Sequence, residues 1–221
     1  MRVVKFGGSS LATGTSVNQA LEIILADPSR QVMVVSAPGK RNSSDIKVTD
    51  LLIKYAKTVL NHQNYSKIVN EIYSRYQEIG LFFGLDETQL NIIKDILLSL
   101  PESSYPTDDY LIAAFKAHGE RLNARLIAMI LNQKGIKTKY LDPHEAGLTV
   151  TGEPNDAIVS PETYLNLDKI KIDSDEHIIF PGFFGITPSG HIATFSRGGS
   201  DITGAILAKG LHADLYEIPY L

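Results

Sequence analysis

Residues 195–201, Phe-Ser-Arg-Gly-Gly-Ser-Asp, combine side chains that can bind both ends of a small zwitterion. Arg197 offers a planar fork suited to a carboxylate or a phosphate, and Asp201 offers an acceptor for an ammonium group. The two glycines follow an alternating apolar segment and precede a helical pattern that begins at Ser200 or Asp201. Backbone N–H groups at such a turn can approach a ligand closely, and a helix N-terminus carries partial positive charge. An ordinary glycine-rich turn with Ser200 as the helix N-cap accounts for the same residues, so the segment needs support from elsewhere.

A second glycine-rich turn lies near the start of the chain, at residues 5–10, Lys-Phe-Gly-Gly-Ser-Ser. It places the cation of Lys5 at a strand end and the backbone donors of Gly7, Gly8 and Ser9 on a tight turn, an arrangement that can hold phosphate. The spacing matches neither the P-loop nor the dinucleotide-binding fingerprint. Lys5 can equally be a solvated lysine at the end of a strand. On its own, this turn is weak support for a phosphate site.

The elements around these two turns indicate an α/β protein. Residues 2–6 and 31–36 are predicted to be short buried strands, separated by a helix that Thr15 or Ser16 could cap. A strand, a glycine-rich turn, a helix and a second strand form the usual opening of a parallel α/β sheet. Residues 181–195 are predicted to form a hairpin that leads into the Arg197 turn. Further strands are expected at residues 136–141, 148–151, 178–180, 192–195 and 213–218.

Between the second and third strands the pattern is mostly helical. Three amphipathic stripes precede the longest predicted helix, at about residues 108–133. That helix is apolar nearly all round and is therefore expected to lie between layers, so the charged Glu120 within it needs a reason. Glu120 could pair with Arg121 or Arg125 on its own helix. Residues 142–156 are rich in Gly, Pro and acidic side chains and are the best candidate for a long surface loop.

Composition excludes several classes of function. The 221 residues are 43% hydrophobic and 21% charged, with a net charge of −4, and no basic stripe suggests a nucleic-acid partner. With no cysteine, disulfides and thiolate metal sites are excluded, and the 6 histidines have no metal-ligand spacing. No segment resembles a secretory signal or reaches membrane-spanning length. We therefore expect a cytoplasmic protein with neither a nucleic-acid nor a membrane partner.

The motifs, taken in order along the chain, resemble those of the aspartate kinases of the amino-acid kinase family. They are Lys-Phe-Gly-Gly-Ser-Ser at residues 5–10, Thr-Asp at 49–50, Gly-Glu at 119–120, Gly-Phe-Phe-Gly at 182–185 and Arg-Gly-Gly-Ser-Asp at 197–201. The resemblance implies an α/β fold, a three-layer αβα sandwich with a mainly parallel central sheet and a largely helical insert at about residues 46–133. It also implies ATP- and Mg²⁺-dependent phosphorylation of L-aspartate to 4-phospho-L-aspartate, the first step of lysine, threonine and methionine biosynthesis. In the full-length protein it implies a homo-oligomer.

The resemblance also implies roles for individual residues. Lys5 and Arg197 would be catalytic, with Lys5 and the backbone of Gly7, Gly8 and Ser9 binding phosphate. No residue is assigned as a metal ligand. The aspartate β-carboxylate, with an ordinary pKa of ~3.9, is already a nucleophile at neutral pH, so no general base is required. Ser36 is expected to border the site, and Thr49 could instead merely cap a helix. The residues expected to bind aspartate are Thr49, Glu120, Phe184, Arg197, Ser200 and Asp201.

Two departures from the family pattern matter. Ser196 stands where many members have glycine, which is a small change. After a strand like residues 214–218, the family continues with a Thr-Asp-x-Asp-Gly element, a nucleotide-binding half and regulatory domains. Residues 1–221 are therefore expected to be the N-terminal, aspartate-binding part of the kinase, with those parts absent. The alternatives are a non-catalytic amino-acid-binding fragment and another enzyme of the same fold that acts on a related acid.

Overall fold

Five short parallel strands form the central sheet. Each strand pairs in parallel with its neighbours, and Lys5 near the end of the first strand lies beside Val34 of the second. The computed structural model describes residues 1–219. The sheet confirms the mainly parallel arrangement expected from the sequence. In spatial order the strands are β3 (Thr138–Tyr140), β6 (His177–Pro181), β2 (Val32–Val35), β1 (Arg2–Phe6) and β9 (Leu215–Glu217).

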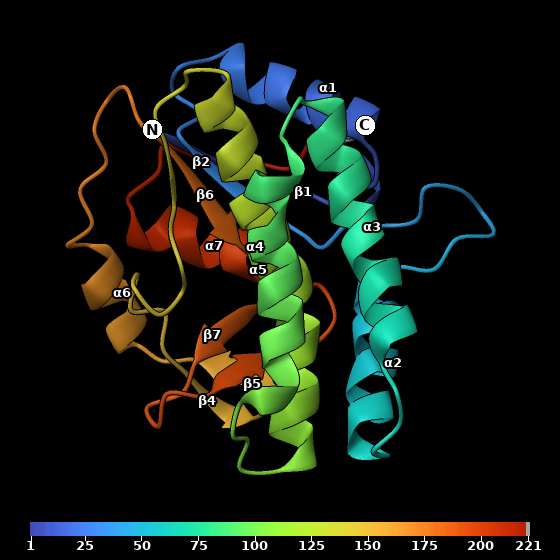
Figure 1. Ribbon diagram of the computed structural model, residues 1–221. Helices are drawn as coiled ribbons and strands as arrows, with labels where there is room; N and C mark the ends of the chain where they lie inside the picture. Colours follow the sequence, from blue (N-terminus) through green and yellow to red (C-terminus); the bar gives the residue numbers. More distant parts are fainter. Residues whose placement is uncertain (220–221) are drawn as a thin grey trace.

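The two faces of this sheet bury different apolar clusters. Successive side chains of a strand point to opposite faces, so Val4 and Phe6 join one cluster while Val3 joins the other. The first cluster includes apolar residues of helices α1 to α5, and the second includes Leu167 of α6 and Leu207 of α7. The sheet thus lies between two layers (Figure 1). This arrangement is the three-layer αβα sandwich that the family resemblance implied.

Helix α1 (Gly14–Leu25) connects β1 to β2 and buries the apolar face that the sequence predicted. Its N-cap is Thr13, which is extended and accepts a hydrogen bond from the backbone N–H of Ser16. The backbone N–H of Thr13 in turn donates to the Ser16 hydroxyl, which completes a capping box. The prediction of Thr15 or Ser16 as the cap was therefore wrong by two or three residues, because Ser16 takes the reciprocal position of the box.

The helical region expected between the strands is present as four helices. The longest, α5, spans Asp108–Gln133 as the sequence predicted, and it packs against both the other helices and strands β6 and β8. The other three helices of this region are α2 (Val48–Leu60), α3 (Ser66–Phe82) and α4 (Glu87–Ser99). Two short 3-10 turns, η1 (Ser9–Leu11) and η2 (Leu100–Glu102), precede α1 and α5.

Within residues 1–219, none of the helices combines the length and apolar character that crossing a membrane requires.

The remaining elements lead to the Arg197 turn. The predicted hairpin is present as antiparallel β7 (Phe184–Ile186) and β8 (Ile192–Thr194), and α7 (Gly199–Gly210) follows it. The long loop predicted at residues 142–156 is present only in its first half, as far as residue 149. Antiparallel β4 (Val150–Glu153) and β5 (Asp156–Val159) occupy its end, and α6 (Glu162–Leu167) comes next. β4 overlaps the strand expected at residues 148–151, whereas β5 was not predicted, because it begins inside the segment taken as a loop and only one of its four residues is buried.

Candidate functional site

Two adjoining cavities open where β1 and β2 end. One has a volume of about 450 Å³ and is called here the Arg197 cavity. The other, of about 440 Å³, is the Gly8 cavity, and the two share Ser36, Thr49 and Glu120 in their walls. The rest of the Arg197 cavity is formed by Lys5, Ile53, Lys116, Asn155, Phe183, Phe195 and residues 196–201. The rest of the Gly8 cavity is formed by Gly8, Ser9, Ala37, Pro38, Gly39, Lys40 and Lys47.

The turns that follow β1 and β2 pack against each other backbone to backbone. The N–H of Gly39 donates to the carbonyl of Gly8 at 2.8 Å. A Cβ atom on Gly39 would lie 2.6 Å from the Gly8 carbonyl carbon, so neither turn has room for a side chain there. Of the three residues predicted to bind phosphate through their backbone, Gly8 and Ser9 line a cavity, whereas Gly7 lies beside Lys5 and lines neither cavity.

Lys5 and Asp201 are joined by an ion pair. The Lys5 ammonium lies 2.6 Å from a carboxylate oxygen of Asp201, and the lysine side chain is 11% exposed whereas that of Asp201 is 50% exposed. The sequence had assigned Lys5 to a phosphate and Asp201 to a substrate ammonium, on opposite parts of a ligand. In the structure the two side chains meet at one point on the wall of the Arg197 cavity.

The turn that carries Arg197 depends on its two glycines. Gly198 has a φ of +83°, in the left-handed region, and it is the N-cap of α7 without a side-chain cap. A Cβ atom on Gly199 would lie 2.6 Å from the Phe183 ring. Ser200 therefore lies inside the helix rather than at its cap, and the alternative of Ser200 as N-cap was wrong. Ser200 is buried and lines the Arg197 cavity together with Arg197.

Of the two neighbouring phenylalanines 183 and 184, Phe183 lines the Arg197 cavity and Phe184 does not. Phe184 is fully buried beside Ala117, and the guanidinium of Arg121 lies 5.0 Å from its ring centroid. Phe183 has a φ of +80°, a costly conformation for a bulky residue, and its N–H donates to the hydroxyl of Thr203 at 2.9 Å. The assignment of Phe184 was therefore one residue off, because the positive φ of Phe183, just before β7 begins, places the two neighbouring side chains differently.

Glu120 is a buried carboxylate exposed by only 5%. Burial raises its pKa to about 8, and the backbone N–H of Ala37 opposes that shift. Within residues 1–219, its Oε2 atom has no hydrogen-bond partner. The alternative of pairing with Arg121 or Arg125 was wrong, since Arg121 instead pairs with Asp142 at 3.0 Å and the Arg125 guanidinium lies 4.3 Å from the Tyr140 ring centroid. A buried carboxylate oxygen without a partner, in a cavity wall, is suited to accept from a cationic group of a ligand.

The close approach of α5 to the turn after β2 puts Glu120 in this position. A Cβ atom on Gly119 would lie 2.7 Å from that of Ala37 and 3.2 Å from a methyl carbon of Leu52. The hydroxyl of Tyr76 donates to the carbonyl of Gly119 at 2.9 Å, which fixes this part of the helix from the α3 side. Glycine at position 119 therefore lets the neighbouring carboxylate reach both cavities.

Sequence reasoning missed Lys116 and misjudged one alternative for Thr49. Lys116 lines the Arg197 cavity, its ammonium lies 5.5 Å from the Phe183 ring centroid, and burial lowers its pKa. Its position one helical turn before Glu120 was a signal that could have identified it. Thr49 caps no helix, because the N-cap of α2 is Lys47 and no side chain caps it. Thr49 and Ser36 instead line both cavities.

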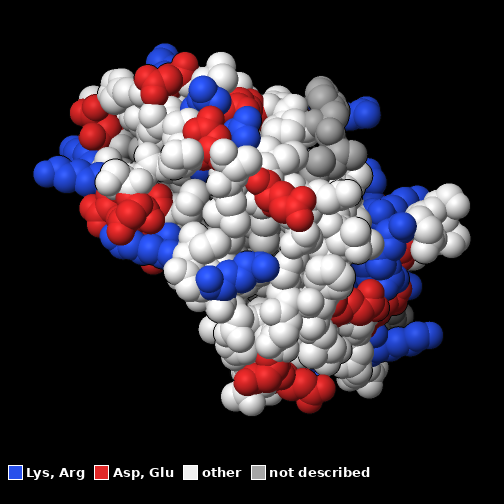
Figure 2. Space-filling model, turned by 90° about the horizontal axis from the view of Figure 1, so that it is seen from above, with Lys and Arg blue, Asp and Glu red and all other residues white. Residues whose placement is uncertain are grey.

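The charge of this region differs from that of the whole chain. The two cavities are lined by five basic and two acidic side chains, although the net charge of the protein is −4. On the face seen from above, by contrast, acidic and basic groups are interspersed and separated by uncharged surface (Figure 2). The cavities therefore suit a ligand with several negative charges and a smaller positive charge. The charged lining consists of Lys5, Lys40, Lys47, Lys116 and Arg197, with Glu120 and Asp201.

Comparison with known proteins identifies a family and several relatives. A model of the amino acid kinase family matches residues 1–218. The chain is 46% identical to aspartokinase 3 of Bacillus subtilis over 98% of this chain and 48% of that protein. It is 26% identical to lysine-sensitive aspartokinase 3 of Escherichia coli, again over 98% of this chain and 48% of that protein. The chain thus spans about half the length of these curated relatives.

Solved structures show the same relationship. The chain matches aspartate kinase of Clostridium acetobutylicum with a TM-score of 0.77 and 31% identity, over 98% of this chain and 47% of that one. It matches E. coli aspartokinase III, solved in complex with aspartate and ADP, with a TM-score of 0.83 and 23% identity, over 99% of this chain and 48% of that one. The second match shows the fold alone.

Proposed function

The chain belongs to the amino acid kinase family, and from that premise we propose that it takes part in the phosphorylation of L-aspartate by ATP, giving 4-phospho-L-aspartate. The observation that carries the proposal is that one cavity is lined both by Arg197 and by the buried carboxylate of Glu120, whose Oε2 atom has no partner within residues 1–219. These groups are complementary to the carboxylate and the ammonium of an amino acid. In this proposal residues 1–221 supply the aspartate-binding part of the kinase domain, with the helical insert at about residues 46–133.

Each end of aspartate has a partner in the Arg197 cavity. Arg197 binds a substrate carboxylate in bidentate fashion, and Glu120 accepts from the ammonium, whose charge favours the ionised form of this residue. Asp201 joins Glu120 when the incoming ligand draws Lys5 away toward phosphate. Ser200, Thr49 and the ring of Phe183 complete the walls. Phe183 replaces Phe184 among the residues proposed to contact the substrate.

The β-carboxylate of aspartate attacks the terminal phosphorus of ATP, and the bond from that phosphorus to the bridging oxygen breaks, releasing ADP. Lys5 and the N–H groups of the Gly8 turn neutralise charge on the transferred group. Within residues 1–219, no group of three or more acidic or histidine side chains could hold a metal ion. Mg²⁺ in this proposal is therefore held chiefly by the phosphates and water, as is usual for this ion.

The relatives named aspartokinase support the wider setting of the proposal. It places the reaction in the cytoplasm, at the start of lysine, threonine and methionine biosynthesis, in a homo-oligomeric protein. The second candidate, an amino-acid-binding module without catalysis, is favoured by one observation. The chain covers only about half of its relatives, so the groups that hold the nucleotide need not all lie within it.

The test is trapping of the acyl phosphate with hydroxylamine, using ATP, Mg²⁺ and L-aspartate, together with calorimetric binding of aspartate. We expect hydroxamate from aspartate but not from glutamate or N-acetylaspartate, which lacks the ammonium that Glu120 requires. Lys5→Ala should abolish turnover and keep aspartate binding, Arg197→Ala should lose both, and the exposed Lys57→Ala should change neither.

Three other outcomes are informative. Saturable aspartate binding without hydroxamate would favour the binding module. Hydroxamate from another acid at a higher rate would move the specificity to a related enzyme of the fold. Full activity of Lys5→Ala or Arg197→Ala would overturn the assignment of the site.

A further inference from the structure

The segment between β2 and α2, residues 37–47, forms the outer wall of the Gly8 cavity. Ala37, Pro38 and Gly39 are buried at its start, whereas Lys40 and Lys47 are exposed and line the cavity from the two ends of the loop. Between them the chain reaches out from the helices as a loop (Figure 1). Two lysine side chains therefore belong to the same cavity as the turn of Gly8 and Ser9.

A buried arginine anchors this loop from below. Arg75 of α3 is exposed by only 2%, which makes it one of the largest fully buried side chains of the protein. Its guanidinium donates to the carbonyl of Gly39 at 2.5 Å and to that of Ile46 at 2.9 Å, and it pairs with Asp45 at 3.1 Å. Gly39 and Ile46, the residues that precede Lys40 and Lys47, thus both accept hydrogen bonds from the guanidinium of Arg75.

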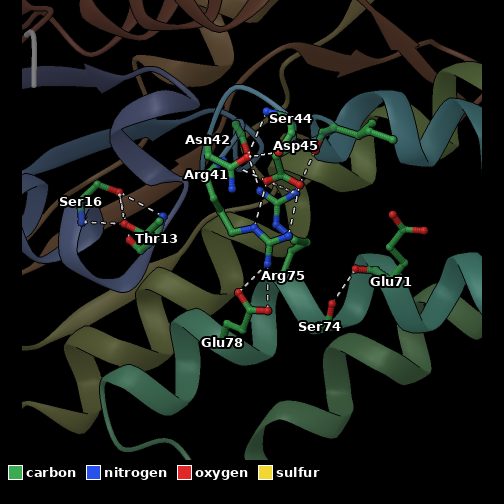
Figure 3. Close-up of polar contacts among 12 residues, drawn as sticks. Thr13, Ser16, Arg41, Asn42, Ser44, Asp45, Glu71, Ser74, Arg75 and Glu78 are labelled. Carbon is green, nitrogen blue, oxygen red and sulfur yellow. Dashed lines mark hydrogen bonds and ion pairs between the residues drawn. The ribbon is translucent and has the colours of Figure 1, made fainter.

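A second arginine holds the tip of the loop. Arg41 pairs with Asp45 at 3.0 Å and with Glu78 of α3 at 2.7 Å, and Asn42 accepts from the backbone N–H of Ser44 (Figure 3). Asp45 therefore lies between two guanidinium groups, which lower its pKa below the usual range. The ion pairs recorded for this loop within residues 1–219 engage Arg41 and Arg75 but neither lysine.

Burying an arginine is costly, and the cost is offset only when its donors are used. The two terminal nitrogens of Arg75 donate to backbone carbonyls of the loop, while its Nε is buried without a partner within residues 1–219, so two of the three guanidinium nitrogens specify where the loop runs. Gly39, which it binds, also donates its N–H to Gly8. A continuous set of hydrogen bonds thus extends from α3 to the turn that the proposed function assigns to phosphate.

We propose that Lys40 and Lys47 bind phosphate groups across the Gly8 cavity, and that Arg75 is the residue that positions them. The ligand is a chain of phosphates or the transferred phosphoryl group itself. Lysine suits this task because a compact ammonium on a flexible stem can follow an oxygen that moves during transfer. The inference rests on the proposed phosphoryl transfer and adds a second, basic wall to that site.

The test uses the protein at its full encoded length, with Lys40→Ala, Lys47→Ala and the double variant. Calorimetry gives the Kd for ATP, for inorganic tripolyphosphate and for L-aspartate. Each single variant should weaken ATP and tripolyphosphate about tenfold, the double variant more, and aspartate binding should not change. Lys57→Ala and Lys67→Ala, which remove exposed lysines of α2 and α3 that line neither cavity, serve as matched controls.

Kinetics in the forward and reverse directions distinguish the two possible ligands, the phosphates of the nucleotide and the transferred phosphoryl group. If the lysines bind the nucleotide, the double variant raises the KM for ATP in the forward reaction. If they bind the transferred group, it raises the KM for 4-phospho-L-aspartate in the reverse reaction with ADP and leaves the ATP affinity near that of the parent. Unchanged affinity for ATP and tripolyphosphate, together with an unchanged reverse KM, would overturn the proposal.

The role of Arg75 is tested by coupling. Arg75→Met should weaken ATP in the same way as the double lysine variant, with aspartate binding retained, and Arg75→Lys should restore part of the loss. Added to the Lys40→Ala/Lys47→Ala background, Arg75→Met should weaken ATP by less than twofold, because the groups that it positions are already gone. Fully additive effects would refute the positioning role and leave Arg75 as a structural residue.

These results separate the inference from the function on which it rests. Tripolyphosphate binding that is lost in the double variant, without hydroxamate from aspartate in the parent, would keep the basic wall and reject aspartate as the substrate. Hydroxamate formation from aspartate, together with undiminished phosphate affinity in the double variant, would keep aspartate as the substrate and reject the basic wall.

Discussion

Replacing Glu120 by glutamine should remove a pH dependence from the stability of the protein. The pKa of this carboxyl is raised from 4.5 to about 8 by burial. Between these values the folded chain holds a proton that the unfolded chain has released, so stability falls as the pH rises. At about 1.4 kcal/mol per pKa unit the total is about 5 kcal/mol, of which about 3 to 4 kcal/mol is lost between pH 5 and pH 8.

Urea unfolding of Glu120→Gln and the parent, followed from pH 5 to pH 8.5, measures this term directly. All other titrating groups cancel in the difference between the two proteins, and the variant should gain about 3 to 4 kcal/mol on the parent across the range. Glu71→Gln, on the exposed face of α3, is the matched control and should show a constant difference. A constant difference for Glu120→Gln as well would refute the raised pKa.

Aspartate binding should also depend on the protonation state of Glu120. Because the substrate ammonium requires the ionised carboxylate, binding at pH 7 should release close to one proton from Glu120. Calorimetry in two buffers with different heats of ionisation counts that proton. Binding by the parent without proton release would show that Glu120 does not accept from the ammonium.

Three further changes test how the site is held. Gly119→Ala should destabilise the protein by about 1–3 kcal/mol in urea unfolding, because its Cβ would lie 2.7 Å from that of Ala37, and Ala37→Gly in the same chain should recover part of the loss. Thr203→Val should cost about 1–3 kcal/mol and weaken aspartate binding, because it removes the acceptor of the Phe183 N–H; Thr203→Ser should restore both. Tyr76→Phe should cost about 1 kcal/mol by removing the buried hydrogen bond from the tyrosine hydroxyl to the carbonyl of Gly119, and an unchanged unfolding midpoint would contradict that contact.

Local patterns in the sequence determined much of the fold. Helix α5 was bounded correctly because a long apolar period follows Thr107, whose hydroxyl accepts from the N–H of Tyr110 at the first turn. The strands β1 and β2 were found because a short apolar run that ends at a glycine turn is typical of a buried parallel strand. Strand β5 was missed because it begins at Asp156, inside the segment predicted as a loop, and only one of its four residues is buried.

The sequence also identified most of the charged side chains of the site. Lys5, Glu120, Arg197 and Asp201 were singled out from motifs near the start, the middle and the end of the chain, and they line one cavity. A glycine beside a charged residue marks a place where the backbone must come close to a ligand or to another segment, and this is a local property of the chain. The roles of these residues remain proposals.

Only the tertiary structure decided which of these groups meet. Whether Phe183 or Phe184 faces the cavity depends on a positive φ that a distant hydroxyl, Thr203, stabilises. The pairing of Lys5 with Asp201 joins residues from opposite ends of the chain. Neither the motif around Lys5 nor the turn that carries Asp201 indicates by itself that the two side chains meet. The pKa of Glu120 depends on the segments that exclude water from it, because desolvation is a property of the assembled walls and not of the helix that carries the carboxylate.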